Sequence, residues 1–332
     1  MKKFIIGTDI SKEKLDMCLM GDGKIIRETV VANHLQAIAG ALGDFMKGNL
    51  VEDFLLCAEY TGQYTYPLSC ACAEMAVDLW LENPAQIKYR SGVQRGKNDR
   101  LDARKIADYA TLFLHKAHLF RLPEKRIAAL KQLISERDMY VCDKGKYKGQ
   151  LNDQKDFMDK DQYKVKSTRL QKLISNLDDA IEQIEAEIQK LIDNDPTLSR
   201  QHELLCSVQG IGDKTALKMI VETNAFRDFK DPRKFCCHAG VAPFLFESGS
   251  SQRSRNKLSN RADKSIKTLL HMAALSATRT KGELNEYYTR KVAEGKNKMS
   301  VINAIRAKLV LRMFAVIRND QFYQKNYINS FA

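Results

Sequence analysis

The chain has no apolar stretch long enough to span a bilayer, and its N-terminus begins a strand pattern rather than a signal peptide. It also has no internal repeat and no low-complexity segment. Its eight cysteines are scattered and lie mostly inside apolar segments. Cys70-Ala71-Cys72 and Cys236-Cys237 have the wrong spacing for a zinc ribbon or finger. These absences favour a cytosolic protein, with no membrane partner, whose cysteines are reduced and buried.

Positive charge is what the chain has in excess. Its 332 residues carry 54 Lys and Arg against 41 Asp and Glu, for a net charge of +13. Residues 201–332 hold about 23 of the basic residues and 11 of the acidic ones. Such an excess favours a polyanionic partner, with nucleic acid first and an anionic membrane surface second. The length and the 44% hydrophobic content allow two domains, or one domain with an appendage.

Residues 1–120 alternate between strand and helix patterns. Strands are predicted at Lys3–Ile10, Leu15–Met20, Lys24–Val31, Phe54–Ala58 and Val77–Leu81. Helices are predicted at Asn33–Lys47, Tyr64–Met75 and Asp102–His115. Three antiparallel strands followed by alternating helices and strands is the order of an RNase H-like α/β fold, although many other α/β sheets share it.

Residues 122–195 are rich in charge and poor in glycine. An a/d seam runs over about three heptads there, formed by Leu170, Ile174, Leu177, Ile181, Ile184, Ile188 and Leu191. The seam fits a two-helix hairpin within one chain or a coiled coil between chains. The strongly charged polar faces favour the second, and with it a homo-oligomer, either a dimer or a tetramer. We therefore expect three regions, at residues 1–121, 122–199 and 200–332.

The third region is predicted to be mainly helical. Residues 204–216 resemble a helix-hairpin-helix, in which the turn Gly210-Ile211-Gly212 would let backbone amides approach a phosphate. The alternative is an ordinary glycine turn between two helices.

Four acidic residues carry the strongest hint of chemistry. Asp9 and Glu59 each follow an apolar strand run, and Asp99 and Asp102 are spaced i, i+3 at the start of a helical pattern. Carboxylates at the ends of adjacent strands and on one helix turn can converge on a divalent metal such as Mg²⁺ or Mn²⁺. Any one of these acids could instead be a surface group or a helix cap, Asp102 above all. In a basic chain, the combination suggests phosphodiester chemistry on nucleic acid.

A serine loop lies in the basic C-terminal region. The turn Ala239–Pro243 is followed by Ser248-Gly249-Ser250-Ser251 and then by a segment with six basic residues, 252–267. This pattern indicates a flexible loop that leads into a phosphate-binding helix, or else a plain polar loop. The expected nucleic-acid contacts are Lys97, Arg100, Gly210, Gly212, Lys214, Arg253, Arg255, Lys257, Arg261, Lys264 and Lys267.

Together these segments resemble the DEDD transposases of the insertion-sequence-110 family, which are related to the Piv DNA invertase and are described as bridge-RNA-guided recombinases. The matching segments, in the family's order, are Gly7–Lys12, Glu59–Tyr64, Asn83-Pro84, Lys97–Ala103, Gly210–Gly212 and Ala239–Pro243 with Ser248-Gly249. Two departures occur. Asn98 stands where the family often has Thr, and Glu247–Ser251 stands where it often has a Ser-Ser-Gly loop.

The resemblance implies an N-terminal RuvC-like domain, a coiled coil, and a C-terminal transposase domain with a catalytic serine. Asp9, Glu59, Asp99 and Asp102 would then be the metal-binding tetrad. Ser248 would be the nucleophile, with Ser250 and Ser251 as the other candidates.

The implied activity is site-specific recombination of double-stranded DNA at element ends and targets, directed by a guide RNA, at the nucleoid in a bacterial cytoplasm. Two alternatives remain from the sequence. One is a RuvC-like Holliday-junction nuclease in which water attacks, and the other is a DNA-binding protein without enzymatic activity.

Overall fold

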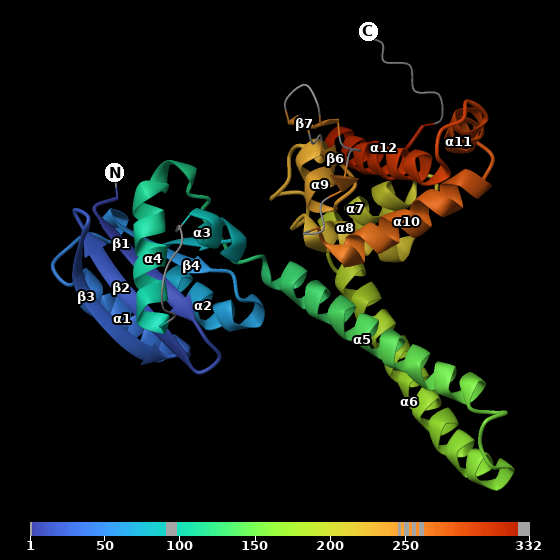
Figure 1. The fold of residues 1–332 in the computed structure, drawn as a ribbon, viewed down its shortest axis with the longest axis horizontal. Coiled ribbons are helices and arrows are strands. Elements are labelled where there is room, and N and C mark those ends of the chain that lie inside the picture. The colour runs from blue at the N-terminus through green and yellow to red at the C-terminus, as the bar shows by residue number, and fades with distance from the viewer. Residues whose placement is uncertain are drawn as a thin grey trace. The chain divides into compact units, whose positions relative to one another are not determined.

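The computed structural model describes residues 2–90, 98–244, 247–248, 252–253, 257–258 and 262–324. By their internal contacts the residues form two units, Met1–Leu122 and Pro123–Ala332 (Figure 1). Within the described ranges, no helix is both long enough and apolar enough to cross a membrane.

The first unit is built on a mixed five-stranded sheet in the order β3-β2-β1-β4-β5. Strands β1 (Phe4–Ile10), β2 (Lys14–Gly21) and β3 (Lys24–Ala32) are antiparallel. Strands β4 (Phe54–Glu59) and β5 (Asp78–Glu82) continue the sheet parallel to β1. The α/β character and the three antiparallel strands predicted from the sequence are therefore confirmed.

Helices cover both faces of this sheet. Helices α1 (Leu35–Met46) and α2 (Tyr66–Glu74) share a core with Ile6 and Phe54, whereas α3 (Pro84–Arg90) and α4 (Asp99–Leu112) share one with Ile5, Leu55 and Trp80. Because both faces are buried, β1 and β4 are nearly continuous apolar runs rather than alternating ones. Short 3-10 turns at Val51–Asp53, Gly62–Thr65 and Leu114–Lys116 complete the unit.

Helix α4 begins three residues earlier than predicted and ends three residues earlier. Its N-cap is Asn98, whose Oδ1 accepts a hydrogen bond from the amide of Arg100 at 3.1 Å. Asp102 therefore lies inside the first turns of the helix, and the suggestion that it caps the helix was wrong. Because Asn and Thr are both good N-caps, this role also gives a physical reason why Asn98 can replace the Thr common in similar chains.

The second unit is almost entirely helical in its described part. Its long helices are α5 (Lys125–Asp153) and α6 (Lys160–Asp193), which pack against each other. The remaining helices are α7 (Pro196–Cys206), α8 (Asp213–Glu222), α9 (Pro232–His238), α10 (Lys264–Arg279), α11 (Glu283–Ala293) and α12 (Lys298–Asn319). Two short antiparallel pairs lie between α9 and α10: β6 (Pro243–Phe244) with β9 (Lys257–Leu258), and β7 (Glu247–Ser248) with β8 (Gln252–Arg253).

The apolar seam of α6 packs in part against other helices of the same chain. Ile184 and Ile188 are buried in one core with Ile127 and Leu130 of α5, whereas Leu170 is only half-buried. The structure thus shows the hairpin alternative at this end of the seam, and pairing between chains stays a prediction. The same core extends into α7 to α12, across the expected limit at residue 199, so that limit also stays a prediction.

Candidate functional site

Gly7 sets how closely α4 lies on β1. A Cβ atom at Gly7 would be 2.2 Å from the carbonyl oxygen of Ala103 and 2.3 Å from the amide nitrogen of Ala107, far inside contact distance. A side chain at this position would therefore push α4 off the sheet. Arg104 of the same helix forms a bidentate ion pair with Glu28 of β3, in which Nε and Nη2 lie 2.6 and 2.7 Å from the two carboxylate oxygens. These contacts fix α4 over the strand that carries Asp9.

The four predicted acids come together at this place. The register of β1 and β4 pairs Thr8 with Ala58, so Asp9 and Glu59 follow as neighbours at the strand ends. Burial raises the pKa of Asp9 to about 6, and the negative charges of Asp102, Asp99 and Asp16 add to the rise. Burial also raises the pKa of Glu59, together with repulsion from Asp9 and Asp102. The carboxylates are therefore close enough to repel one another.

Two lysines partly neutralise the cluster. Lys105 Nζ lies 2.5 Å from Asp102 Oδ1, and Lys14 Nζ lies 2.9 Å from Asp99 Oδ2 and 3.0 Å from Asp16 Oδ2. Asp16 is a fifth carboxylate. It is only 6% exposed and lies opposite Asp9 in the β1–β2 pair. The two lysine ammonium groups thus lie against the clustered carboxylates, where the negative charge favours a cation.

The sequence reasoning missed Asp16, Lys14 and Lys105. The signal for Asp16 was available, because a charged residue inside a buried strand is unusual and the short turn after Ile10 sets the register that places it beside Asp9. Glu82, the neighbour of Glu59 in β5, is already used: its carboxylate accepts hydrogen bonds from Tyr109 Oη at 3.0 Å and from the Asn83 amide at 2.7 Å.

The donor set fits a hard divalent cation. It offers carboxylate oxygens, the ligands that Mg²⁺ and Mn²⁺ prefer, at half-buried positions where mutual repulsion already disfavours the charged forms. A cation bound there would relieve that repulsion.

The two glycines of the predicted phosphate-binding turn have different surroundings. Gly210 has a φ of +92°, and a Cβ atom there would be 2.9 Å from both the Ala273 carbonyl oxygen and the Ala277 Cβ of α10. Packing against α10 therefore accounts for Gly210. Gly212, the N-cap of α8, has open space around it, and Lys214 in the first turn is exposed.

The predicted basic contacts are only partly within the described residues. Arg100 on α4 and Lys264 in the first turn of α10 are exposed, and Lys267 is half-buried. The backbones of Ser248, Arg253 and Lys257 belong to β7, β8 and β9, where Ser248 pairs with Gln252. The remaining predicted residues lie outside the described part of the chain: Lys97, Ser250, Ser251, Arg255 and Arg261.

Two family models match successive parts of this chain. A transposase model for DEDD enzymes of the IS110 type matches residues 6–158, and a model of the transposase IS116/IS110/IS902 family matches residues 202–289. The chain belongs to the IS110 transposase family. It is accordingly an enzyme that cleaves DNA and transfers strands, of a kind that typically uses a divalent metal. The alternative of a DNA-binding protein without enzymatic activity is abandoned.

Some similar proteins align with nearly the whole chain and others with less than half of it. It is 25% identical over 328 residues to a pilin gene-inverting protein of Moraxella bovis, which covers 98% of this chain and 99% of that protein. It is 24% identical over 141 residues to the uncharacterized 43.6 kDa protein of insertion element IS110 in Streptomyces coelicolor, which covers 42% of this chain and 34% of that protein.

Proposed function

We propose that the chain is a site-specific recombinase of an insertion element, with Asp9, Glu59, Asp99 and Asp102 as the metal-binding tetrad of a RuvC-like domain. The observation that carries this proposal is the gathering of the acids at one end of the sheet, where burial first, and then their mutual repulsion, raises the pKa of Asp9 to about 6 and raises that of Glu59. A surface acid or a helix cap would have no such neighbours.

Bound Mg²⁺ or Mn²⁺ would supply Lewis-acid stabilisation of charge on the scissile phosphate. The chain's own part is to hold four to five carboxylates at one end of the sheet, with α4 seated on Gly7. Lys14 and Lys105 keep Asp99, Asp16 and Asp102 paired in the absence of the metal. They would have to release these carboxylates when it binds.

Ser248 is the proposed nucleophile. Its Oγ would bond to phosphorus while the bond from phosphorus to one deoxyribose oxygen breaks and that oxygen leaves as a hydroxyl, taking up a proton. Attack by the hydroxyl of another strand would then reform a DNA phosphodiester and release the serine. No bond energy is lost to water in this sequence, which suits strand exchange. The support is the serine's position in a basic segment of a chain of this family.

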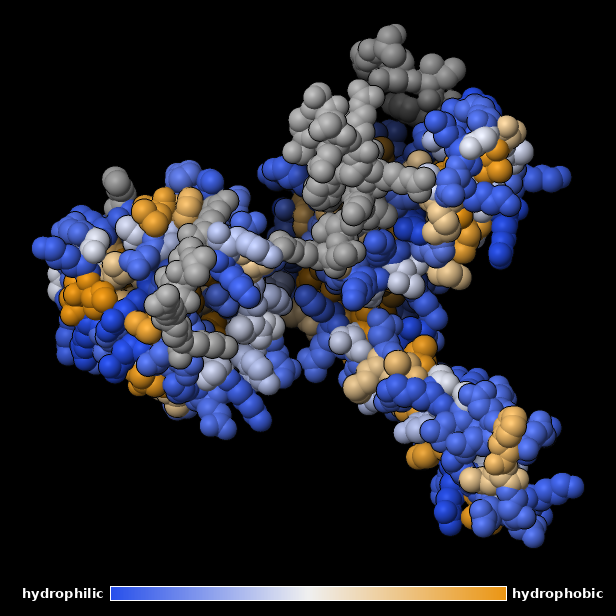
Figure 2. All heavy atoms as spheres, viewed as in Figure 1, coloured by the Kyte–Doolittle hydropathy of each residue, from blue (hydrophilic) through white to orange (hydrophobic). Residues whose placement is uncertain are grey.

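The proposed tetrad and the proposed nucleophile Ser248 belong to different units of the chain. Support for a homo-oligomer comes from α5 and α6, where Val141, Val165 and Leu173 are 42%, 52% and 45% exposed. Figure 2 shows apolar groups among the hydrophilic ones on these helices. Pairing between chains would bury them.

The proposed DNA partner is double-stranded DNA at element ends and targets, and a guide RNA is proposed on the resemblance alone. The open N-terminus of α8 at Gly212, with Lys214, and the start of α10, with Lys264 and Lys267, would contact backbone phosphates. The name of the Moraxella bovis relative, which refers to inversion of a pilin gene, supports site-specific rearrangement. A DNA substrate of this kind places the proposed activity at the bacterial nucleoid.

A cleavage assay on a cognate junction tests the proposal. The wild-type chain with Mg²⁺ should form a protein–DNA adduct that survives denaturant. Ser248→Ala should form none while still binding metal, and Asp9→Asn should lose both. Metal-dependent cutting by Ser248→Ala, without an adduct, would favour the Holliday-junction nuclease, in which water attacks.

A further inference from the structure

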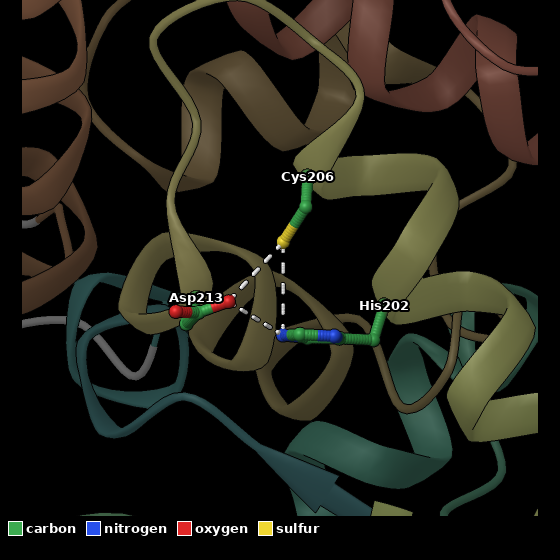
Figure 3. Close-up of side chains that lie close together, drawn as sticks. All are labelled: His202, Cys206 and Asp213. Carbon is green, nitrogen blue, oxygen red and sulfur yellow. Dashed lines mark hydrogen bonds and ion pairs between the residues drawn. The ribbon is translucent and has the colours of Figure 1, made fainter.

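A second group of metal-binding side chains lies in the helical unit. His202 and Cys206 are spaced i, i+4 on α7 and therefore share one face of that helix. Asp213 is the first residue of α8 and is brought back toward them by the turn that contains Gly210. Figure 3 shows the three side chains pointing toward one another from these two helices.

The three donor atoms form a nearly regular triangle. His202 Nε2 lies 3.6 Å from Cys206 Sγ and 3.3 Å from Asp213 Oδ1, and Cys206 Sγ lies 3.6 Å from Asp213 Oδ1. Zinc bonds of about 2.0–2.1 Å to nitrogen or oxygen and about 2.3 Å to sulfur, at tetrahedral angles, place the donors about 3.3 Å apart for N and O and about 3.6 Å apart for S with either. The observed edges match this triangle.

We propose that His202, Cys206 and Asp213 bind one divalent transition-metal ion, Zn²⁺ by preference, as a site separate from the carboxylate tetrad. One imidazole, one thiolate and one carboxylate form a mixed N, S, O donor set that selects zinc over Mg²⁺. A fourth position is left for a solvent oxygen. The spacing His-x3-Cys-x6-Asp belongs to neither a zinc ribbon nor a finger, so cysteine spacing alone does not reveal the site.

The surroundings suit such an ion. The side chain of His202 is 16% exposed, and Cys206 is half-buried, so these two donors are held in place. Asp213, at 80% exposed, is free to close on the metal. The group borders a cavity of about 860 Å³ that is also lined by Lys214 and Thr268, and this opening provides access for the ion and for solvent.

Binding would exchange a proton for the metal. Cysteine binds a metal as the thiolate, whereas the Cys206 thiol donates a hydrogen bond to Asp213 Oδ1 in the metal-free chain. Formation of the metal–sulfur bond would release this proton to solvent, one per ion bound. The ion would then join the end of α7 to the start of α8 across the glycine turn. It would fix the face that carries Gly212 and Lys214.

A comparable group, Glu222, His238 and Asp263, fits a metal less well. Asp263 Oδ1 already accepts hydrogen bonds from the Ser265 and Ile266 amides at 2.8 and 3.0 Å. Glu222 is paired with Lys218 at 3.0 Å. These groups already have partners that a metal would have to displace.

Titration of the full-length, reduced chain with Co²⁺ tests the proposal, because a cobalt–thiolate bond gives a near-ultraviolet charge-transfer band that carboxylates do not give. The wild-type chain should develop the band to saturation at one thiolate-bound ion per chain. An excess of Mg²⁺ should leave the band in place, and Zn²⁺ should abolish it. Cys206→Ser should remove it, whereas Cys142→Ser, at an exposed cysteine of α5, should not.

The absence of a band in the wild-type chain would overturn the proposal and leave a hydrogen-bonded triad. A band that persists in Cys206→Ser would overturn it as well. If Cys206→Ser does not fold, Asp213→Asn provides a second test at an exposed side chain. It should keep the wild-type circular dichroism and weaken Co²⁺ binding by roughly tenfold or more, in the range found when a metal site loses a supporting group. Unchanged affinity in this variant would exclude Asp213 as a ligand and contradict the three-residue site.

Discussion

Replacement of Asp9 by Asn should stabilise the metal-free first unit while it destroys the proposed metal site. The pKa of Asp9 is raised from 3.8 to about 6 by burial and by repulsion from Asp102, Asp99 and Asp16. At about 1.4 kcal/mol per pKa unit, the charged carboxylate would cost about 3 kcal/mol of the free energy of unfolding. Because the residue is only half-buried, solvent screening reduces this to about 1–2 kcal/mol.

The stability difference between Asp9→Asn and the wild type should depend on pH. The folded chain holds the Asp9 proton more tightly than the unfolded chain does. The free energy of unfolding therefore falls as the pH rises from about 4 to about 6. The asparagine side chain of the variant carries no charge at any pH. The free energy of unfolding of the variant should thus exceed that of the wild type at pH 7.5 and come close to it at pH 4.5.

Trp80 provides the assay. It is the one tryptophan of the chain, and it is buried in the core under α4, so its fluorescence reports unfolding of the first unit. Urea unfolding in the presence of a chelator should give the stability difference at the two pH values. With Mg²⁺ added, the wild type should gain stability and the Asp9→Asn variant should not. An Asp9→Asn variant that is no more stable at pH 7.5, or equally stabilised at pH 4.5, would refute the reasoning.

Three further perturbations follow from the packing and charge of the two units. Gly7→Ala should lower the free energy of unfolding seen by Trp80 by about 1–3 kcal/mol, because its Cβ meets the backbone of α4; Gly40→Ala, which meets nothing within 4 Å, should not lower it. Leu173→Glu should reduce the oligomer mass measured by light scattering and leave the helical circular dichroism unchanged, and an unchanged mass would exclude α6 as the interface. Replacing Lys264 and Lys267 by Ala should reduce the slope of log binding constant against log salt for DNA by about 2, and an unchanged slope would exclude both from phosphate contact.

The sheet and the four acids could be predicted because both depend on local pattern. Buried parallel strands are continuous apolar runs, and a carboxylate at the end of such a run stands out. Strands β1, β2 and β3 pair with their neighbours in the sequence, whereas the pairing of β1 with β4 joins strands that are far apart in the chain. The clustering of Asp99 and Asp102 with Asp9 depends in addition on Gly7, whose missing side chain lets α4 approach.

Other features depend on contacts that a pattern does not specify. Asn98 and Asp102 are both plausible caps, and the structure shows that Asn98 is the one used, because its side chain accepts a hydrogen bond from the Arg100 amide. The heptad seam shows that α6 needs an apolar partner but not which chain supplies it. In the same way, the spacing of His202 and Cys206 is visible in the sequence, whereas the arrival of Asp213 depends on how α8 turns back.

Mapping the residue that becomes joined to DNA tests the central claim most directly. The adduct formed with Mg²⁺ on a labelled junction would be digested to peptides and nucleotides, and the modified residue identified by mass spectrometry. We predict a nucleotide on Ser248, absent when Asp9 is replaced by Asn. Efficient metal-dependent cleavage with no modified serine between residues 248 and 251 would contradict this claim.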